Sequence, residues 1–225
     1  MDLIMKQMPV VVSALNVGFL QTLKLFIVTL VGALPLGLVI AFGSMSHFKP
    51  LSWLARLIVW VIRGTPLMIQ LLIIYSFPGL VLHNPIWGGG ETGRFLAAAV
   101  SFIINYACYF SEIYRGGIQG VPEGQKEAGL VLGMTKHQIF FKITLLQMIK
   151  RIVPPMSNEI ITLVKDTSLA FVLGMAEMFS VAKALDASNV SMIPYAIAAL
   201  IYWVFCLFIE FILGRVEKKL AYYHD

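Results

Sequence analysis

The feature that most constrains this chain is an apolar run from Leu25 to Ser46 that contains no charged side chain. A helix that crosses the hydrocarbon core of a membrane needs about 20 mostly apolar residues. This run is long enough to form one such helix. Of the 225 residues, 59% are hydrophobic and only 13% are charged, which also places the chain among membrane proteins.

The remaining apolar segments predict further membrane helices. A segment from Leu51 to Ile62, interrupted by Arg56, is expected to lie shallowly at the membrane surface. The turn-rich stretch from His83 to Arg94 is expected to be an exposed loop. Four more spans are expected at Gly64–Leu82, Phe95–Ile113, Pro154–Val181 and Met192–Leu213. The sequence therefore predicts an all-α polytopic membrane protein with about five transmembrane helices, in which residues 1–225 form a single domain.

Basic residues predict the orientation, because Lys and Arg in short loops favour the cytoplasmic side. In the five-span arrangement, one side of the membrane receives Lys49, Arg56, the basic residues between 115 and 151, and Arg215, Lys218 and Lys219. This predicts a multi-pass protein of the cytoplasmic membrane with its N-terminus outside and its C-terminus inside. The N-terminal residues lack the pattern of a cleavable signal peptide, so the first apolar segment is expected to be retained. Because the net charge of +5 is divided among short polar segments, nucleic acid is not an expected partner.

Residues 114–151 differ from the spans, because charged and apolar side chains alternate there at helical spacing, as in an amphipathic helix outside the hydrocarbon. Within this segment, Glu127-Ala128-Gly129 is followed after three residues by Gly133, and after nine more by Ile143-Thr144-Leu145-Leu146. This spacing resembles the EAA loop of ABC importer permeases, in which Glu-Ala-Ala is followed by Gly and then by Ile, one residue and Leu-Pro. Gly129 replaces the second Ala, and Leu146 replaces the Pro. The first change keeps a small residue, and the second is expected to make the exit from the loop helix less sharply bent.

The resemblance covers most of the chain. In detail, the sequence is similar to the polar amino acid uptake branch of type I importers. It is carried further by Arg63-Gly64-Thr65-Pro66, Tyr114-Arg115-Gly116-Gly117-Ile118, Asn158-Glu159 and Lys165-Asp166-Thr167-Ser168-Leu169. It implies a permease subunit, not an enzyme, that imports polar amino acids by alternating access. The implied partners are cytoplasmic ABC ATPase subunits, an extracellular substrate-binding protein and a second permease, in a homodimer or a heterodimer.

The resemblance also implies that residues 114–151 form a cytoplasmic coupling-helix loop that docks on the ATPase. Glu127, Ala128, Gly129 and Gly133 are the expected docking residues, and Gly133 would permit a turn between two short helices. Composition alone leaves open an ordinary amphipathic helix on the inner leaflet. The chain contains no Gly-x-x-x-x-Gly-Lys-Ser/Thr phosphate loop. ATP and Mg²⁺ are therefore expected on the partner ATPase, and no cofactor, metal site or catalytic residue is expected in this chain.

Candidate substrate-binding residues lie in the span that begins at Pro154. Ionisable groups inside a span are costly and usually face a protein interior or a water-filled cavity. At about 100° per residue, Glu159, Thr162 and Asp166 fall within roughly 60° of one another, and Lys165 lies about 100° round from Asp166. Two carboxylates on one face would suit a cationic side chain such as arginine, lysine or histidine. Lys165 could instead pair with either carboxylate in a structural site, and permeases for neutral and acidic amino acids share the pattern, so specificity stays open.

A second candidate region is Gly64-Thr65-Pro66, followed one turn later by Gln70. Pro near the first turn of a helix is well tolerated, which favours a simple helix start at the interface. The same residues could equally form a break in a span, whose freed backbone groups would face a ligand. Gly64, Thr65 and Gln70 are therefore candidate substrate-binding residues.

Single features of the sequence are compatible with two other functional classes. An ion-coupled secondary transporter could use Glu159 and Asp166 as proton or sodium ligands, although the short chain shows no internal repeat. A membrane enzyme could use the same carboxylates as acid and base, although no second cluster of His or Asp accompanies them.

Overall fold

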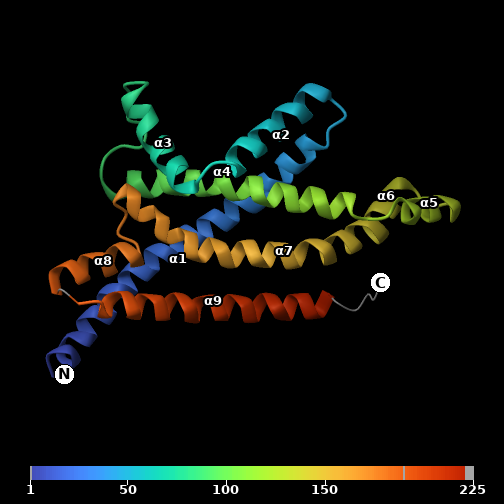
Figure 1. The fold of residues 1–225 in the computed structure, drawn as a ribbon. Coiled ribbons are helices and arrows are strands. Elements are labelled where there is room, and N and C mark those ends of the chain that lie inside the picture. Colours follow the sequence, from blue (N-terminus) through green and yellow to red (C-terminus); the bar gives the residue numbers. More distant parts are fainter. Residues whose placement is uncertain (1, 190, 221–225) are drawn as a thin grey trace.

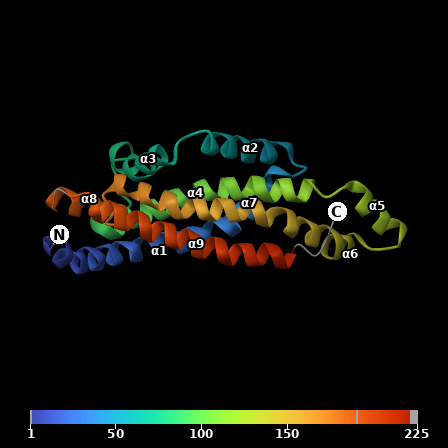
Figure 2. The same cartoon turned by 60° about the horizontal axis from the view of Figure 1, so that its bottom comes forward.

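The computed structural model describes residues 2–189 and 191–220, and all its regular elements in these ranges are helical. Four long helices form the body of the molecule: α1 (Asp2–Ser44), α4 (Gly90–Gln119), α7 (Leu145–Asp166) and α9 (Ile193–Leu220) (Figures 1 and 2). Three helices are long and apolar enough to cross a membrane, and five spans result if each of two bent helix pairs counts as one. The fold class predicted from the sequence is therefore confirmed. The outermost residues of the predicted domain, 1 and 221–225, lie outside the described ranges.

The first helix begins much earlier than the predicted start at Leu25, because α1 starts at Asp2 and its apolar part at Met8. The prediction was wrong because polar residues interrupt the apolar run in the sequence. In the fold two of these polar residues, Gln21 and Thr22, have partners, and Lys24 is exposed. Thr22 is fully buried and its hydroxyl accepts a hydrogen bond from the Met178 amide at 3.3 Å, while the Gln21 amide donates to Glu91 at 3.2 Å.

The predicted surface segment and the predicted second span are α2 (Lys49–Arg63) and α3 (Leu67–Leu80), which bend by 109° at Gly64-Thr65-Pro66. The predicted break in the span is therefore present, while the predicted contact of its backbone groups with a ligand stays a prediction. Pro66 forms the N-cap of α3 in an extended conformation. Together α2 and α3 form a bent arm that lies to one side of the four long helices (Figures 1 and 2).

Helix α4 is the centre of the packing. It is longer at both ends than the predicted Phe95–Ile113, so the loop before it is shorter than predicted. Its N-cap is Gly89, and Glu91 in its first turn interacts favourably with the helix dipole. Small residues let α1 approach closely, since a Cβ on Gly37 would meet the Ala107 carbonyl oxygen at 2.9 Å.

The span predicted to start at Pro154 in fact starts at Leu145, and both prolines lie inside α7. Proline removes one backbone hydrogen bond and crowds the preceding turn, yet such residues are tolerated in membrane helices when neighbours satisfy the freed groups. Before α7, residues 114–144 contain the end of α4, then α5 (Glu123–Val131), α6 (Lys136–Ile139) and η1, a π-helical turn (Phe140–Thr144). Elements α6, η1 and α7 follow one another without a gap. Leu146, which stands in the Pro position of the EAA pattern, lies inside α7.

After Asp166 the chain continues as η2, a 3₁₀ helix (Thr167–Leu173), and then as α8 (Met178–Asn189). The prediction of one helix to Val181 was wrong, because Gly174 adopts a left-handed conformation with φ of 70° and ends the helix. The resulting bend is 58°. The last helix, α9, extends to Leu220 rather than to Leu213.

The break between α2 and α3 frees carbonyl groups, and Gln70 satisfies them. Its Nε2 atom lies 2.8 Å from the Ile62 carbonyl oxygen and 3.0 Å from that of Thr65. The Asn105 amide of α4 donates to the Gln70 Oε1 atom at 3.0 Å, which fixes the orientation of the Gln70 amide. The carbonyls at the break are therefore bonded inside the chain.

This arrangement predicts that Gln70→Glu destabilises the protein, because a carboxylate of the same shape cannot donate to the two carbonyls. An unsatisfied buried polar group costs about 1–3 kcal/mol. We expect the apparent melting temperature in detergent to fall by about 4–8 °C. Gln125→Glu, on the exposed surface of α5, makes the same chemical change and should leave melting unaltered. Equal melting of the two variants would contradict the role assigned to Gln70.

Candidate functional site

The acidic face of α7, defined here as Glu159, Thr162 and Asp166, lies on the part of the helix before its end at Asp166. Both carboxylates are half-buried and Thr162 is exposed. The Thr162 hydroxyl donates to the Asn158 carbonyl oxygen at 2.9 Å, so its lone pairs remain available as acceptors. Glu159 and Asp166 lie within electrostatic range of each other. The face therefore presents concentrated negative charge within a mostly apolar bundle.

A tyrosine that the sequence interpretation missed holds one of these carboxylates. The Tyr106 hydroxyl of α4 donates to the Asp166 Oδ2 atom at 2.7 Å. Tyr106 is almost fully buried, and its ring stacks on Phe102. A buried tyrosine usually finds a hydrogen-bond partner, so a tyrosine in an apolar span indicates a polar contact. The sequence does not identify that partner, because it lies 60 residues away.

Lys165 is exposed, and it lies within electrostatic range of Asp166 without forming an ion pair with it. It lines a groove of about 590 Å³ beside Tyr195, Tyr202 and Trp203. Both ion pairs found within residues 2–189 and 191–220 involve Glu112, so Lys165 forms no ion pair with Glu159 or Asp166 there. The geometry thus separates Lys165 from the three residues with which the sequence interpretation grouped it.

The residues at the break between α2 and α3 have different environments. Gly64 and Thr65 are exposed, and the Thr65 hydroxyl donates to the Val61 carbonyl oxygen at 3.0 Å. Gln70 is buried and its amide is occupied by the bonds described above. Gln70 therefore shapes the break from inside, whereas Gly64 and Thr65 lie on the surface.

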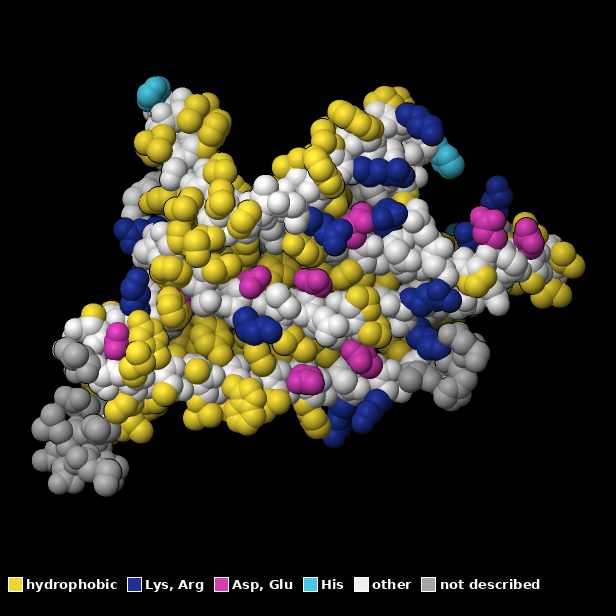
Figure 3. Space-filling view, viewed as in Figure 1, with side chains coloured by type: hydrophobic (Ala, Val, Ile, Leu, Met, Phe, Trp, Pro, Cys, Tyr) yellow, Lys and Arg dark blue, Asp and Glu magenta, His cyan; other side chains and the backbone are white. Residues whose placement is uncertain are grey.

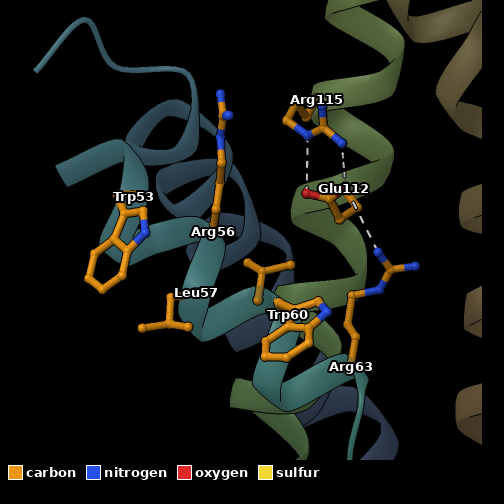
Figure 4. Close-up of a pocket in the computed structure, with 8 residues that line it drawn as sticks. Trp53, Arg56, Leu57, Trp60, Arg63, Glu112 and Arg115 are labelled. Atoms are coloured by element: carbon orange, nitrogen blue, oxygen red, sulfur yellow. Dashed lines mark hydrogen bonds and ion pairs between the residues drawn. The ribbon is translucent and has the colours of Figure 1, made fainter. Parts of the chain in front are cut away.

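Arg63, at the end of α2, connects the arm to α4. Its Nη1 atom lies 3.8 Å from the Glu112 carboxylate (Figure 4). Its guanidinium also lies 5.0 Å from the centre of the Tyr109 ring. Arg115 chelates the same carboxylate, with Nε 3.1 Å from Oε1 and Nη2 2.5 Å from Oε2. Arg63 also lies within electrostatic range of Glu159 on the acidic face.

The loop hairpin, defined here as α5, α6 and the turn between them, projects from one end of the long helices (Figure 1). Gly133 has a φ of 72°, and its amide donates to the Leu130 carbonyl oxygen at 3.0 Å. Thr135 and Gln138 then form a reciprocal capping box at the start of α6. The predicted turn at Gly133 between two short helices is confirmed.

The predicted docking residues divide into two sets. Glu127, Ala128 and Gly133 are exposed, whereas Gly129 is buried inside the loop hairpin against Ile139. The most exposed apolar residues of the hairpin are Val131 at 88% and Leu132 at 78%. The sequence interpretation did not select these two, although consecutive apolar residues at the tip of a polar segment were a visible signal.

Comparison with known proteins places this architecture among transport proteins. The model of the family described as "Binding-protein-dependent transport system inner membrane component" matches residues 33–222. The L-cystine transport system permease protein of Bacillus subtilis (strain 168) is 38% identical over 213 residues, which are 93% of this chain and 87% of the relative. The arginine transport system permease protein of the same organism is 37% identical over 205 residues, 90% of each chain. Among solved structures, an amino acid ABC transporter with histidines matches with a TM-score of 0.85 and 33% identity, covering 95% of this chain and 97% of that one.

The packing of the loop hairpin predicts that Gly129→Ala loosens it. A Cβ at this position would lie 2.8 Å from Ile139 Cγ1, so Ile139 or the backbone has to move. Overpacking of this kind costs about 1–3 kcal/mol. We expect amide hydrogen exchange over residues 123–144 to become at least about fivefold faster, measured by mass spectrometry on the purified protein.

Two further variants make that experiment decisive. Gly124→Ala, in the same helix with open space around its position, should leave exchange unchanged or slower. Removing the obstructing side chain in Gly129→Ala/Ile139→Ala should recover part of the lost protection. Identical exchange in the wild type and Gly129→Ala would show that the hairpin does not depend on this close approach.

Proposed function

Because the chain belongs to the family of inner membrane components of binding-protein-dependent transport systems and is the permease subunit of an amino acid ABC importer, we propose that it moves polar amino acids inward past the acidic face of α7. It is a multi-pass membrane protein and not an enzyme in itself. The observation that carries the proposal is the pair of half-buried carboxylates, one of them held by Tyr106. The ion-coupled carrier is not favoured, because the family consists of binding-protein-dependent systems.

The proposed substrate contact follows from charge. Ionised carboxylates in a span are costly unless they face water, a partner charge or a ligand. Every amino acid carries an ammonium group, and a basic amino acid carries a second cation that two carboxylates can share. Glu159, Thr162 and Asp166 form the contact, with Gly64 and Thr65 at the neighbouring exposed break. The similarity to an arginine permease supports a basic substrate, and the similarity to an L-cystine permease supports a polar one.

The proposed energy source is a cytoplasmic ABC ATPase that docks on the loop hairpin and binds ATP and Mg²⁺. The exposed Glu127 and Ala128, beside the apolar tip at Val131 and Leu132, supply the docking surface. Gly129 and Gly133 act indirectly, by setting the close packing and the turn of the hairpin. ATP-driven movement of the ATPase subunits shifts the hairpin, and α7 follows because helix α6 continues into it.

The proposed assembly and orientation follow from the same arrangement. Family membership implies ATPase and substrate-binding partners. A second permease, identical or similar, completes the cavity that the acidic face requires, and the binding protein delivers the amino acid from outside. The C-terminal end of α9 lies toward the side of the loop hairpin, and the start of α1 lies away from it (Figure 1). This arrangement supports an external N-terminus, an internal C-terminus and one permease domain over residues 1–225.

The acidic face predicts that Asp166→Asn lowers uptake more than it lowers assembly. The amide keeps an acceptor for the Tyr106 hydroxyl, so the loss is confined to charge. At limiting substrate we expect initial uptake in reconstituted vesicles to fall at least about tenfold, the effect of losing one charged hydrogen bond. Glu210→Gln, which removes an exposed carboxylate from α9, is the matched control. Uptake that is equally fast in both variants would remove Asp166 from the substrate path.

The docking surface predicts that Glu127→Lys prevents recovery of the ATPase with the tagged permease, because it places a positive charge where the partner is expected to present basic or backbone donors. Membrane insertion should be unaffected, since Glu127 is exposed. Gln125→Lys adds the same charge elsewhere on α5 and should preserve recovery. Normal ATPase recovery with Glu127→Lys in a pull-down would count against docking at this position.

A further inference from the structure

An apolar groove of about 520 Å³ lies between the end of α1 and the first half of α2, and the proposed function does not use it. Its volume falls within the range of small-molecule sites. Side chains of α1 between residues 39 and 43 form one wall, and the other wall is formed by Leu51, Leu54, Ala55 and Ile58. Ser46, in the turn between the helices, is the polar residue of the lining. A groove of this composition suits a hydrocarbon chain.

The α2 wall of this groove is only partly covered by protein. Leu51, Leu54 and Ile58 follow one another at helical spacing on one face, and they are 46%, 50% and 45% exposed. The buried residues of α2 are Ser52 and Val59, which lie outside this wall. Apolar contact for the first half of α2 must therefore come in part from a molecule in the groove.

The polar end of the groove lies where the first span ends. The apolar part of α1 ends at Ser44, and the turn that follows contains the exposed His47. One turn into α2, Trp53 is 68% exposed, and tryptophan is typical of the boundary between hydrocarbon and headgroups. From Ser46 the groove extends past seven residues of α1, about 10 Å of helix, toward Val39. It therefore leads from the level of the headgroups into the hydrocarbon.

A hydrogen bond holds the Arg56 guanidinium at this polar end. The Arg56 Nε atom donates to the Ser44 carbonyl oxygen at 3.1 Å, and the Ser52 hydroxyl donates to the same oxygen at 2.6 Å. Ser44 lies between Gly43 and Ser46, which both line the groove. Figure 4 shows the Arg56 guanidinium pointing away from Arg63. Neither terminal nitrogen of Arg56 forms a hydrogen bond within residues 2–189 and 191–220, so both remain available to an anion.

A second basic residue adds positive charge beside the same turn. Lys49 begins α2, is exposed, and lies two helical turns from Arg56 on the same side of the helix. Figure 3 shows basic side chains and a histidine gathered at the turn between α1 and α2, next to hydrophobic side chains of α2. Glu112 lies within electrostatic range of Arg56, but it is already chelated by Arg115. The polar end of the groove therefore favours an anion, and a guanidinium suits a phosphate.

We propose that the groove between α1 and α2 binds one anionic phospholipid, with an acyl chain along Leu51, Leu54 and Ile58 and its headgroup at Arg56 and Lys49. A phospholipid brings the hydrocarbon and the anion in one molecule, whereas a protein partner would need an apolar face and a carboxylate aimed at Arg56. The bound lipid supports the first half of the bent arm where protein packing does not. This inference goes beyond the proposed function and does not depend on the substrate path.

The experiment measures lipid affinity by native mass spectrometry of the permease purified with its ATPase subunits. Phosphatidylglycerol is compared with phosphatidylcholine that carries the same acyl chains, so that only the headgroup charge differs. We expect the wild type to bind phosphatidylglycerol at least about tenfold more tightly, because two basic side chains lie at the headgroup. Arg56→Gln should reduce this ratio about fivefold without weakening the binding of phosphatidylcholine. Lys218→Gln, which removes an exposed charge from the end of α9, should leave the ratio unchanged.

A second variant tests the position of the acyl chain. A Cβ on Gly43 would lie 3.7 Å from the Ala55 Cβ atom, so Gly43→Leu fits the backbone and fills the groove. We expect it to weaken both lipids at least about fivefold and to keep their ratio. Gly214→Leu adds the same side chain to α9, where a Cβ meets open space, and should change neither affinity.

Five results would overturn the proposal. These are equal affinity of the wild type for the two lipids, equal weakening of both lipids by Arg56→Gln, and a loss of ratio in Lys218→Gln as large as in Arg56→Gln. The second of these would indicate a structural role of the bond to Ser44, and the third a general attraction of the membrane surface. Unchanged lipid affinity in Gly43→Leu would place the acyl chain elsewhere. Dissociation of the permease pair by Gly43→Leu in the same spectra, with unchanged lipid affinity, would assign the groove to a second copy of this chain.

Discussion

The bonds between Gln70 and the carbonyls of Ile62 and Thr65 are the interaction on which the rest of the arrangement depends. Inside a membrane, backbone polar groups have no water to bond with, so a broken helix persists only where side chains satisfy it. Gln70 does this at the 109° bend, and Asn105 anchors Gln70 to α4. The bend sets the position of Arg63 at the end of α2. The bent arm of α2 and α3 therefore relies on one buried amide.

Two carboxylates of this protein are held by partners of different kinds, Asp166 by a neutral hydroxyl and Glu112 by a guanidinium. Tyr106 fixes Asp166 from α4, and Arg115 fixes Glu112 on the same helix. Lys165 lines another groove and forms no ion pair with Asp166 in the described residues, although it is the neighbour of Asp166 in the chain and lies within its electrostatic range. Had Lys165 paired with Asp166, the acidic face would keep one uncompensated carboxylate instead of two and would attract a cation less strongly. The helical rotation between consecutive residues thus keeps Lys165 out of direct contact with the carboxylate that we propose contacts the substrate.

Much of the fold could be predicted from sequence, because the features that define a membrane span depend on residues that are adjacent in the chain. Apolar length predicted about five spans, and Gly133 predicted the hairpin turn, since each depends on a few adjacent residues. The start of α1 could not be predicted, because the partner of Thr22 is the Met178 amide, 156 residues away. The start of α7 was predicted too late, at Pro154, for a related reason. Whether a helix tolerates two prolines depends on their neighbours in the fold, which the sequence does not show. Tyr106 was missed because its bond joins two spans, whereas the spacing of Glu159 and Asp166 lies within one.

The π-helical turn at Phe140–Thr144 lies between the loop hairpin and the acidic face, and it fixes how far one is rotated about the helix axis relative to the other. A π turn accommodates one more residue than an α turn, and each residue of a helix corresponds to a rotation of about 100°. The direction in which Glu159 and Asp166 point, relative to the hairpin, is therefore set by the length of this short segment. A one-residue deletion there would keep every side chain of both regions and still rotate the carboxylates by about 100° relative to the hairpin. Where two sites are joined by a continuous helical segment, the number of residues between them matters to the mechanism as much as the residues of the sites do.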